Sequence, residues 1–126
     1  MDSSWDKSFS LFKSLTTFLI GTWIVDRETF IVEMIKLLRK SIANLKNCNL
    51  RKNAKNIVFS DGNPKSKIML IGEAPGANED AEGLPFVGRA GMLLDKMLAA
   101  INLDRKKVYI SNIINYRPPE NRRPTD

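Results

Sequence analysis

The stretch GEAPGANEDAEGLPFVGRAG, residues 72–91, is the most informative part of this sequence. It follows the apolar run Ile68–Ile71 and leads into a segment with helical apolar spacing, residues 90–101. Ligands of α/β sheets bind beyond the carboxyl ends of the strands. Loops at that edge carry function because the scaffold holds them in place. The segment therefore predicts an α/β protein with a site in this Gly- and Pro-rich loop, which also bears carboxylates.

The flanking sequence predicts a helix before the loop and a second strand after it. Apolar side chains at spacings of three and four put one face on a helix over residues 27–44: Ile31, Ile35, Leu38, Ile42 and Leu45. Residues 57–59 are expected to be extended, 68–71 a buried strand and 108–114 a second strand. A helix over residues 90–101 is expected to turn these side chains to the core: Leu93, Leu94, Met97, Leu98 and Ile101. Strand, loop, helix and strand form a βαβ unit, which implies parallel pairing.

The two ends of the chain predict its organisation. Residues 1–44 are expected to be a helical segment that precedes the α/β domain of residues 45–126. The apolar run Leu15–Val25 is shorter than the roughly 20 residues that span a bilayer, so it is expected to pack as a helix, with membrane association as the alternative. The chain stops within a loop, and two parallel strands do not make a stable sheet alone. We therefore expect a domain that lacks its C-terminal half.

The charge of the chain indicates an anionic partner. The net charge is +6 over 126 residues. A run without acids between residues 34 and 60 carries Lys36, Arg39, Lys40, Lys46, Arg51, Lys52 and Lys55. A second cluster near the end holds Arg117, Arg122 and Arg123. Such runs are often only a solvated surface, but two of them flanking a site loop favour nucleic acid.

Cysteine and histidine usage limits the chemistry. Cys48 is the only cysteine, so neither an internal disulfide nor a four-cysteine metal site can form within this chain. A reducing compartment, the cytoplasm, is the natural location for such a chain. The sequence has no histidine, which removes the commonest general base and metal ligand.

Residues 72–91 and the segment VYISNIINYRPPENRRP, residues 108–124, together resemble the uracil-DNA glycosylase superfamily. The match is to family 4, the bacterial and archaeal group also described as phage-type DNA polymerase-related, and it covers the N-terminal portion of the family's domain. The resemblance implies a three-layer α/β/α fold with a parallel sheet. It also implies hydrolysis of the N-glycosidic bond of uracil in DNA during base excision repair, by a monomer without a catalytic metal.

The resemblance implies how the base is held once it is flipped out of the stack. Phe86 is the stacking ring, with a core phenylalanine as the alternative. Asn112 reads the pyrimidine edge, because an amide both donates and accepts; a structural Asn at a strand end is the other reading. Backbone amides of Glu73, Ala74 and Gly76 line the pocket and stabilise the departing base anion.

Two carboxylates are the implied catalytic residues. Glu79 is expected to position or deprotonate the attacking water, and Glu73 to assist it. A carboxylate can also stabilise an oxocarbenium-like sugar. The alternative is that these acids only cap a helix, since Asn78, Glu79 and Asp80 suit a helix N-terminus.

The resemblance also implies contacts with DNA. Asn121 matches a family asparagine close to the DNA, and the phosphate contacts are assigned to Arg117, Arg122 and Arg123. Residues 88–91, including Arg89, begin the helix. Their amides either bind phosphate or only turn the chain.

The sequence departs from the family in two places. Many members hold a [4Fe–4S] cluster on four cysteines; here Cys48 alone stands in the CxxC position, Tyr116 takes the place of the third ligand, and the fourth falls past residue 126. We therefore expect no cluster, with Cys48 a relic. The later histidine motif is also absent. An inactive fragment that at most binds DNA is thus the alternative function, and an unrelated nucleotide-binding α/β protein is a third.

Overall fold

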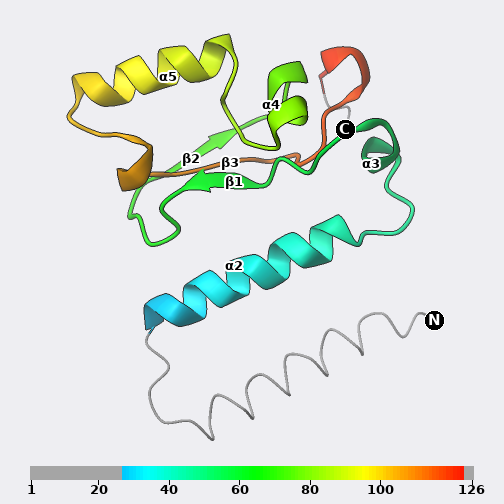
Figure 1. Ribbon diagram of the computed structural model, residues 1–126, viewed down its shortest axis with the longest axis horizontal. Coiled ribbons are helices and arrows are strands. Elements are labelled where there is room, and N and C mark those ends of the chain that lie inside the picture. The colour runs from blue at the N-terminus through cyan, green and yellow to red at the C-terminus, as the bar shows by residue number, and fades with distance from the viewer. Residues whose placement is uncertain (1–26, 124–126) are drawn as a thin grey trace, which may run out of the picture.

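A computed structural model describes residues 27–123 (Figure 1). The expected helix Leu15–Val25 lies outside the described residues. The elements follow in the order α2 (Arg27–Ala43), α3 (Asn49–Asn53), β1 (Ser60–Gly62), β2 (Met69–Gly72), α4 (Ala77–Glu82), α5 (Arg89–Ala100), η1 (Arg105–Lys107), β3 (Tyr109–Asn112) and η2 (Pro119–Asn121).

The described strands form a small mixed sheet in the order β1-β3-β2. β2 and β3 pair in parallel, with Gly72 opposite Asn112, so the expected βαβ unit is confirmed. β1 pairs antiparallel with β3, and Ser60 lies opposite Ser111. The expectation of a parallel sheet is therefore wrong for β1. Residues 63–68 join β1 to β2 and are long enough only to reverse the chain. β1 therefore runs opposite to β2, and hence to β3, which is parallel to β2. A β1 parallel to them would need a crossover of about a dozen residues or more.

The core lies between the centre of the sheet and α5. Leu98 of α5 packs with Val108 and Ile110 beside and within β3. The side chains that surround this cluster are Leu70, Phe86, Leu94 and Leu103. β3 is the most buried strand because it lies between β1 and β2, which cover both of its edges.

β2 differs from its prediction in position and burial. It runs from Met69 to Gly72, and Ile68, Met69 and Ile71 are exposed. The first extended segment also lies later than expected, because residues 57–59 precede β1. An apolar run predicts burial only where another element covers both faces of a strand. Among the described residues β2 is an edge strand with one partner.

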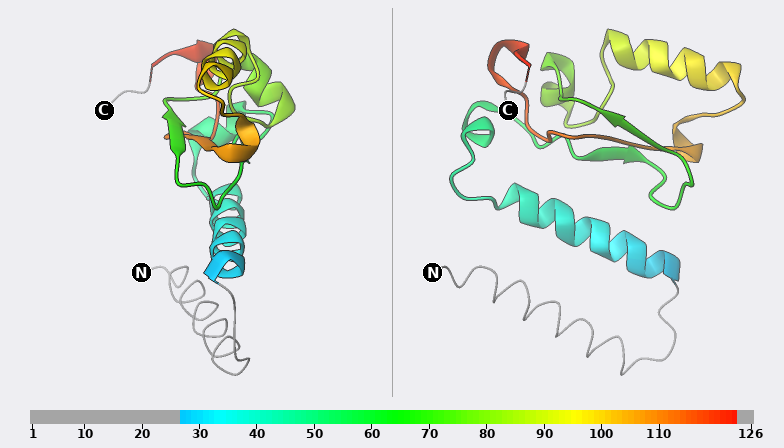
Figure 2. Two further views of the ribbon diagram at one scale, coloured as in Figure 1. Left: turned by 90° about the vertical axis from the view of Figure 1, so that its left-hand side faces the viewer. Right: turned by 180° about the vertical axis from the view of Figure 1, so that it is seen from behind.

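The two long helices lie on opposite sides of the sheet (Figures 1 and 2). α5 buries Leu98 and half-buries Leu94, whereas the predicted core residues Leu93, Met97 and Ile101 are at least 60% exposed. α2 has the predicted bounds within one residue but contains no buried residue. Leu38 and Leu45 of its predicted apolar face are exposed. The prediction that Leu38 and Leu45 pack against a core is therefore wrong.

A short helix, α4, interrupts the loop that was expected to be irregular between Gly72 and Arg89. It begins after Gly76 and ends at Gly83, whose φ of 73° is the left-handed conformation that glycine adopts readily. Asp80 is 2% exposed, and its Oδ1 accepts hydrogen bonds from the amides of Lys55 (2.9 Å) and Asn56 (3.2 Å). This buried carboxylate ties the segment after α3 to α4.

Candidate functional site

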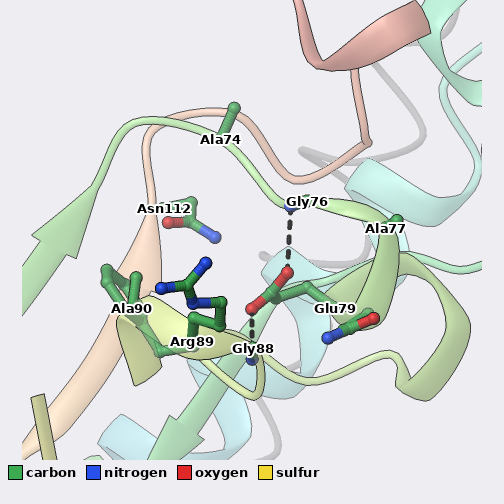
Figure 3. A pocket seen from close by; sticks show the side chains of 10 residues that line it. Ala74, Gly76, Ala77, Glu79, Gly88, Arg89, Ala90 and Asn112 are labelled. Carbon is green, nitrogen blue, oxygen red and sulfur yellow. Dashed lines mark hydrogen bonds between the residues drawn. The ribbon is translucent and has the colours of Figure 1, made fainter. Parts of the chain in front are cut away.

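A pocket of about 390 Å³ opens at the carboxyl ends of β2 and β3 (Figure 3). The parallel register that sets Gly72 opposite Asn112 brings the loop after β2 next to the end of β3. The start of α5 closes the remaining side. The lining residues are Ala74, Gly76, Ala77, Asn78, Glu79, Phe86, Gly88, Arg89, Ala90 and Asn112.

Gly72 lets two side chains meet at the floor of this pocket. A Cβ at position 72 would lie 2.6 Å from Cζ of Phe86 and would also overlap Oδ1 of Asn112. Real Cβ atoms are not found that close to other heavy atoms. The Asn112 amide and the Phe86 ring therefore share space that only a glycine leaves open.

Asn112 is buried but keeps its amide available. The residue is 7% exposed, and its side chain makes no hydrogen bond with any residue between 27 and 123. Figure 3 shows the side chain extending into the pocket, and the guanidinium of Arg89 extends into it as well. A side-chain amide that reaches a pocket with unused donor and acceptor atoms is suited to bind a ligand that offers the complementary pair.

Glu79 holds the two ends of the loop together. Its Oε2 accepts from the Gly76 amide at 3.1 Å, and its Oε1 accepts from the amides of Val87 (3.0 Å) and Gly88 (2.8 Å). The alternative that Glu79 caps a helix is confirmed, because it is the N3 residue of α4. Gly76 lines the pocket as expected, and its amide donates to Glu79.

Phe86 occupies a strained turn between α4 and α5. Its φ is 57°, a conformation that is uncommon for residues with a side chain. Gly91 of α5 packs on the Phe86 carbonyl so closely that a Cβ there would overlap the carbonyl oxygen and carbon. The Phe86 ring contacts the core and also lines the pocket.

Arg105, outside the pocket, binds the same turn from the opposite side. Its guanidinium donates to the carbonyls of Pro85 (3.1 Å) and Phe86. It also pairs with Asp61 and Asp95, each at 2.8 Å. Burial disfavours the charged form, but hydrogen bonds to the two carboxylates outweigh it and raise the pKa of Arg105 above its ordinary value. The guanidinium is charged at every accessible pH.

The predicted site residues divide into two groups. The pocket brings together Ala74, Gly76, Glu79, Phe86, Arg89 and Asn112. Glu73 is exposed outside the lining, and its carbonyl accepts from the Ile114 amide. Apart from Arg89, the predicted DNA contacts lie on the loop after β3, at the same end of the sheet (Figure 1), where Arg117 donates to Asn121 at 2.8 Å and Arg122 and Arg123 are exposed.

Comparison with known proteins identifies the family. A sequence profile described as the uracil DNA glycosylase superfamily matches residues 59–126, which is more than half of the chain. The chain belongs to this superfamily. The resemblance carried by residues 72–91 and 108–124 is thereby confirmed.

Individual relatives narrow the similarity within the superfamily. The chain is 47% identical over 94 residues to the type-4 uracil-DNA glycosylase of Archaeoglobus fulgidus, covering 75% of this chain and 47% of the relative. It is 42% identical over 93 residues to the type-4 enzyme of Thermotoga maritima, covering 74% of this chain and 48% of the relative. A DNA polymerase of Bacillus phage SP01 is 37% identical over 65 residues, 51% of this chain and 7% of the relative. The chain spans about half the length of the type-4 relatives.

Sequence reasoning assigned no role in the pocket to Gly72, Asn78 or Arg105. Asn78 lines the pocket, a Cβ at Gly72 would meet the Phe86 ring, and Arg105 donates to the Phe86 carbonyl. The signal for Gly72 was a glycine directly after an apolar strand, which often marks a close approach. Arg105 left no local signal, because its partners lie ten to forty-four positions away in sequence.

The described residues do not fit the iron–sulfur cluster of many family 4 members. No group of three or more His, Cys, Asp and Glu side chains within residues 27–123 could hold a metal ion. Tyr116, in the place of the third ligand, is 7% exposed, and its hydroxyl donates to the Ile42 carbonyl at 3.3 Å. That position is filled by an aromatic ring. Separately, none of the helices between residues 27 and 123 has the length and hydropathy to cross a membrane.

Proposed function

We propose that this chain carries the base-binding half of a type-4 uracil-DNA glycosylase, which removes uracil from DNA in base excision repair. The observation that carries the proposal is the meeting of the Asn112 amide and the Phe86 ring over Gly72, in a pocket at the ends of two parallel strands. The similarity to type-4 enzymes supports it.

Asn112 and Phe86 are the proposed uracil-binding residues. Uracil presents an N–H beside a carbonyl, and a side-chain amide matches both with one acceptor and one donor. The side-chain amide of Asn112 makes no hydrogen bond with the described residues. A flipped base can therefore bind to it without breaking any hydrogen bond within the protein. Phe86 supplies the stacking face. Since the Gly76 amide donates to Glu79, the amides of Ala74 and Glu73 are the proposed donors that stabilise the oxygens of the departing anion.

Glu79 and Glu73 are the proposed catalytic carboxylates. A water molecule attacks C1′ of the sugar, and the N-glycosidic bond breaks with its electron pair leaving on the uracil anion. The proton that the water releases passes to the Glu79 carboxylate and from there to solvent. A carboxylate offers about four acceptor positions. Three backbone amides occupy three of the positions on Glu79, which leaves one free. We propose that the last position orients the water. Glu73, exposed at the end of β2, is proposed to stabilise positive charge on the sugar.

The remaining assignments concern DNA and the complete domain. Arg89, Arg117, Arg122 and Arg123 are proposed to bind phosphates, with Asn121 beside them. We propose an N-terminal helical segment over residues 1–44 and a partial glycosylase domain over residues 45–126, which in the complete enzyme is a three-layer α/β/α monomer. The cytoplasm is the proposed location.

We propose that the protein works without an iron–sulfur cluster. The ligand position at Tyr116 holds a buried ring, and Cys48 is the only thiol in the chain. The purified protein is expected to show no broad absorbance around 400 nm, the usual region for such clusters, and no stoichiometric iron by elemental analysis. Protein made with added iron and sulfide is the control. Iron at cluster stoichiometry in that sample would refute this assignment.

An excision assay tests the function. Single- and double-stranded oligonucleotides with one uracil are incubated with the protein and then with alkali, which cleaves at abasic sites. Asn112→Ala is expected to lower the excision rate by about 100-fold, the loss typical of one stabilising hydrogen-bond donor. The control is Asn53→Ala, which changes an exposed asparagine of α3. Full activity in a Phe86→Ala, Asn112→Ala, Glu79→Ala triple variant would refute the site.

DNA binding without catalysis is the second candidate, favoured by the basic run before β1. Its cations are all exposed: Lys36, Arg39, Lys40, Lys46, Arg51, Lys52 and Lys55. If wild-type protein excises no uracil but binds DNA with an affinity that falls steeply as salt rises, this second function replaces the first.

A further inference from the structure

Arg105 occupies a position that joins three separate parts of the domain. It begins η1, the turn between α5 and β3. Its guanidinium pairs with Asp61 of β1 and Asp95 of α5, and donates to the carbonyls of Pro85 and Phe86 in the loop before α5. The side chain is 24% exposed. Its donors thus converge on the backbone of the turn that carries the proposed stacking ring.

The turn at Phe86 needs such external support. A side chain at a positive φ costs about 1–3 kcal/mol and persists only where the surrounding structure imposes it. Gly91 presses on one side of the Phe86 carbonyl, and Arg105 binds the same oxygen. Strain of this kind clusters at functional sites. The ring that the turn projects lies against Gly72 beside Asn112.

The chemistry of the contact calls for arginine and not just a positive charge. A guanidinium is planar and presents five donors in a fixed fork. Here those donors reach two carboxylates and two carbonyls at once. A lysine ammonium is a single point of charge, so it could pair with Asp61 or Asp95 but could not also hold both carbonyls of the turn.

We propose that Arg105 is a positioning residue that acts through Phe86: it holds the strained turn so that the ring stays beside Asn112 as one wall of the base pocket. The expected effect of Arg105 on activity rests on the proposed uracil-excising function. The placement of the ring, however, can be measured without activity.

The first test separates positioning from DNA binding. Arg105→Lys and Arg105→Gln are compared with Lys106→Gln, an exposed cation one position along the same turn, which controls for loss of charge. Single-turnover excision is expected to slow by about 100-fold in the Arg105 variants, as for a reacting group displaced by about an ångström. Their affinity for the uracil-containing oligonucleotide and the behaviour of Lys106→Gln are expected to match the wild type.

The second test follows the ring itself by NMR of protein with ¹³C-labelled phenylalanine rings, the Phe86 signal being assigned with Phe86→Leu. The Phe86 signal is expected to move or broaden in folded Arg105→Lys, while the signal of Phe59, buried beside β1, stays in place. Arg105→Lys keeps a cation between Asp61 and Asp95, so it remains informative if Arg105→Gln does not fold.

The outcomes distinguish this inference from the function on which it rests. An inactive wild type overturns the proposed glycosylase, and the NMR result then decides the role of Arg105 alone. An unchanged Phe86 signal in folded Arg105→Lys overturns the positioning role, whatever the activity. Slower excision caused only by weaker DNA binding, with the ring signal unchanged, overturns it as well.

Discussion

At the scale of single residues, two glycines contact different parts of the pocket: one its side chains, the other the backbone behind them. Gly72 faces the side chains of Asn112 and Phe86, whereas Gly91 faces the Phe86 backbone. Side chains can rotate away from an added methyl group, but a backbone carbonyl held by Arg105 cannot. Equal changes at the two positions should therefore have different consequences.

Gly72→Ala is expected to disturb the pocket more than the fold. The new methyl group displaces the Asn112 amide or the Phe86 ring, so excision of uracil should fall by about 100-fold, at a stability cost of about 1–3 kcal/mol. Gly91→Ala should instead cost about 3 kcal/mol or more, because the overlap is with backbone. Chemical denaturation and the excision assay measure the two effects. Equal stability losses in both variants would contradict this interpretation.

Asp80 gives a second prediction at this scale. Asp80→Ala leaves the part-buried amides of Lys55 and Asn56 without their acceptor, which should lower the free energy of unfolding by about 2 kcal/mol. Asp80→Asn retains a carbonyl oxygen in the place of Oδ1, so it should recover most of the loss. Urea denaturation of the pair tests this. A cost in Asp80→Asn as large as that in Asp80→Ala would show that charge, and not the acceptor, matters.

At the scale of elements, α5 shows how far a helical pattern can be trusted. Its apolar spacing predicted the helix nearly to the residue, but not which side chains are buried. Leu98 is 4% exposed and contacts Val108 and Ile110, whereas Leu93 is 60% exposed. Spacing identifies a face of a helix, and burial depends on what lies against that face. For Leu93, Met97 and Ile101, the described residues provide nothing that covers them.

Substitutions in α5 test this division. Leu98→Ala should cost about 2–5 kcal/mol, since it leaves a cavity in the core. Leu93→Ala keeps the helix propensity and should stay within about 0.5 kcal/mol of the wild type. Thermal or urea unfolding compares the two variants. A loss for Leu93→Ala close to that for Leu98→Ala would mean that Leu93 is covered in solution.

At the scale of the whole molecule, α2 stands apart from the rest. It has no buried residue, and within residues 27–123 its polar contacts with the α/β part include the bond from the Tyr116 hydroxyl to the Ile42 carbonyl and an ion pair between Glu28 and Lys65. Exposed ion pairs contribute little to stability. Elements with few buried apolar contacts open first.

Hydrogen exchange should therefore report α2 as the least protected of the long helices. Its amides are expected to exchange by local opening, well before that of Ile110 in the fully buried centre of β3. The α5 amides around Leu98 serve as the internal reference. Protection in α2 equal to that at Ile110 would show that α2 unfolds only together with the core.

The resemblance of residues 72–91 and 108–124 to the superfamily pointed to six of the pocket residues. Local patterns in the sequence determined the α/β class, the helices near residues 27–44 and 90–101, and the parallel pairing of β2 with β3. Those features depend on apolar spacing and on glycines that lie close together in the chain. Tertiary structure alone decided that β1 runs antiparallel, that Leu93 and Ile71 are exposed, and that the Glu79 carboxylate also binds the amides of Val87 and Gly88. It alone also brought Arg105 against Phe86, nineteen positions earlier in the chain. Hydrogen bonds between such distant residues follow from how elements pack, and packing leaves no periodic trace in the order of amino acids.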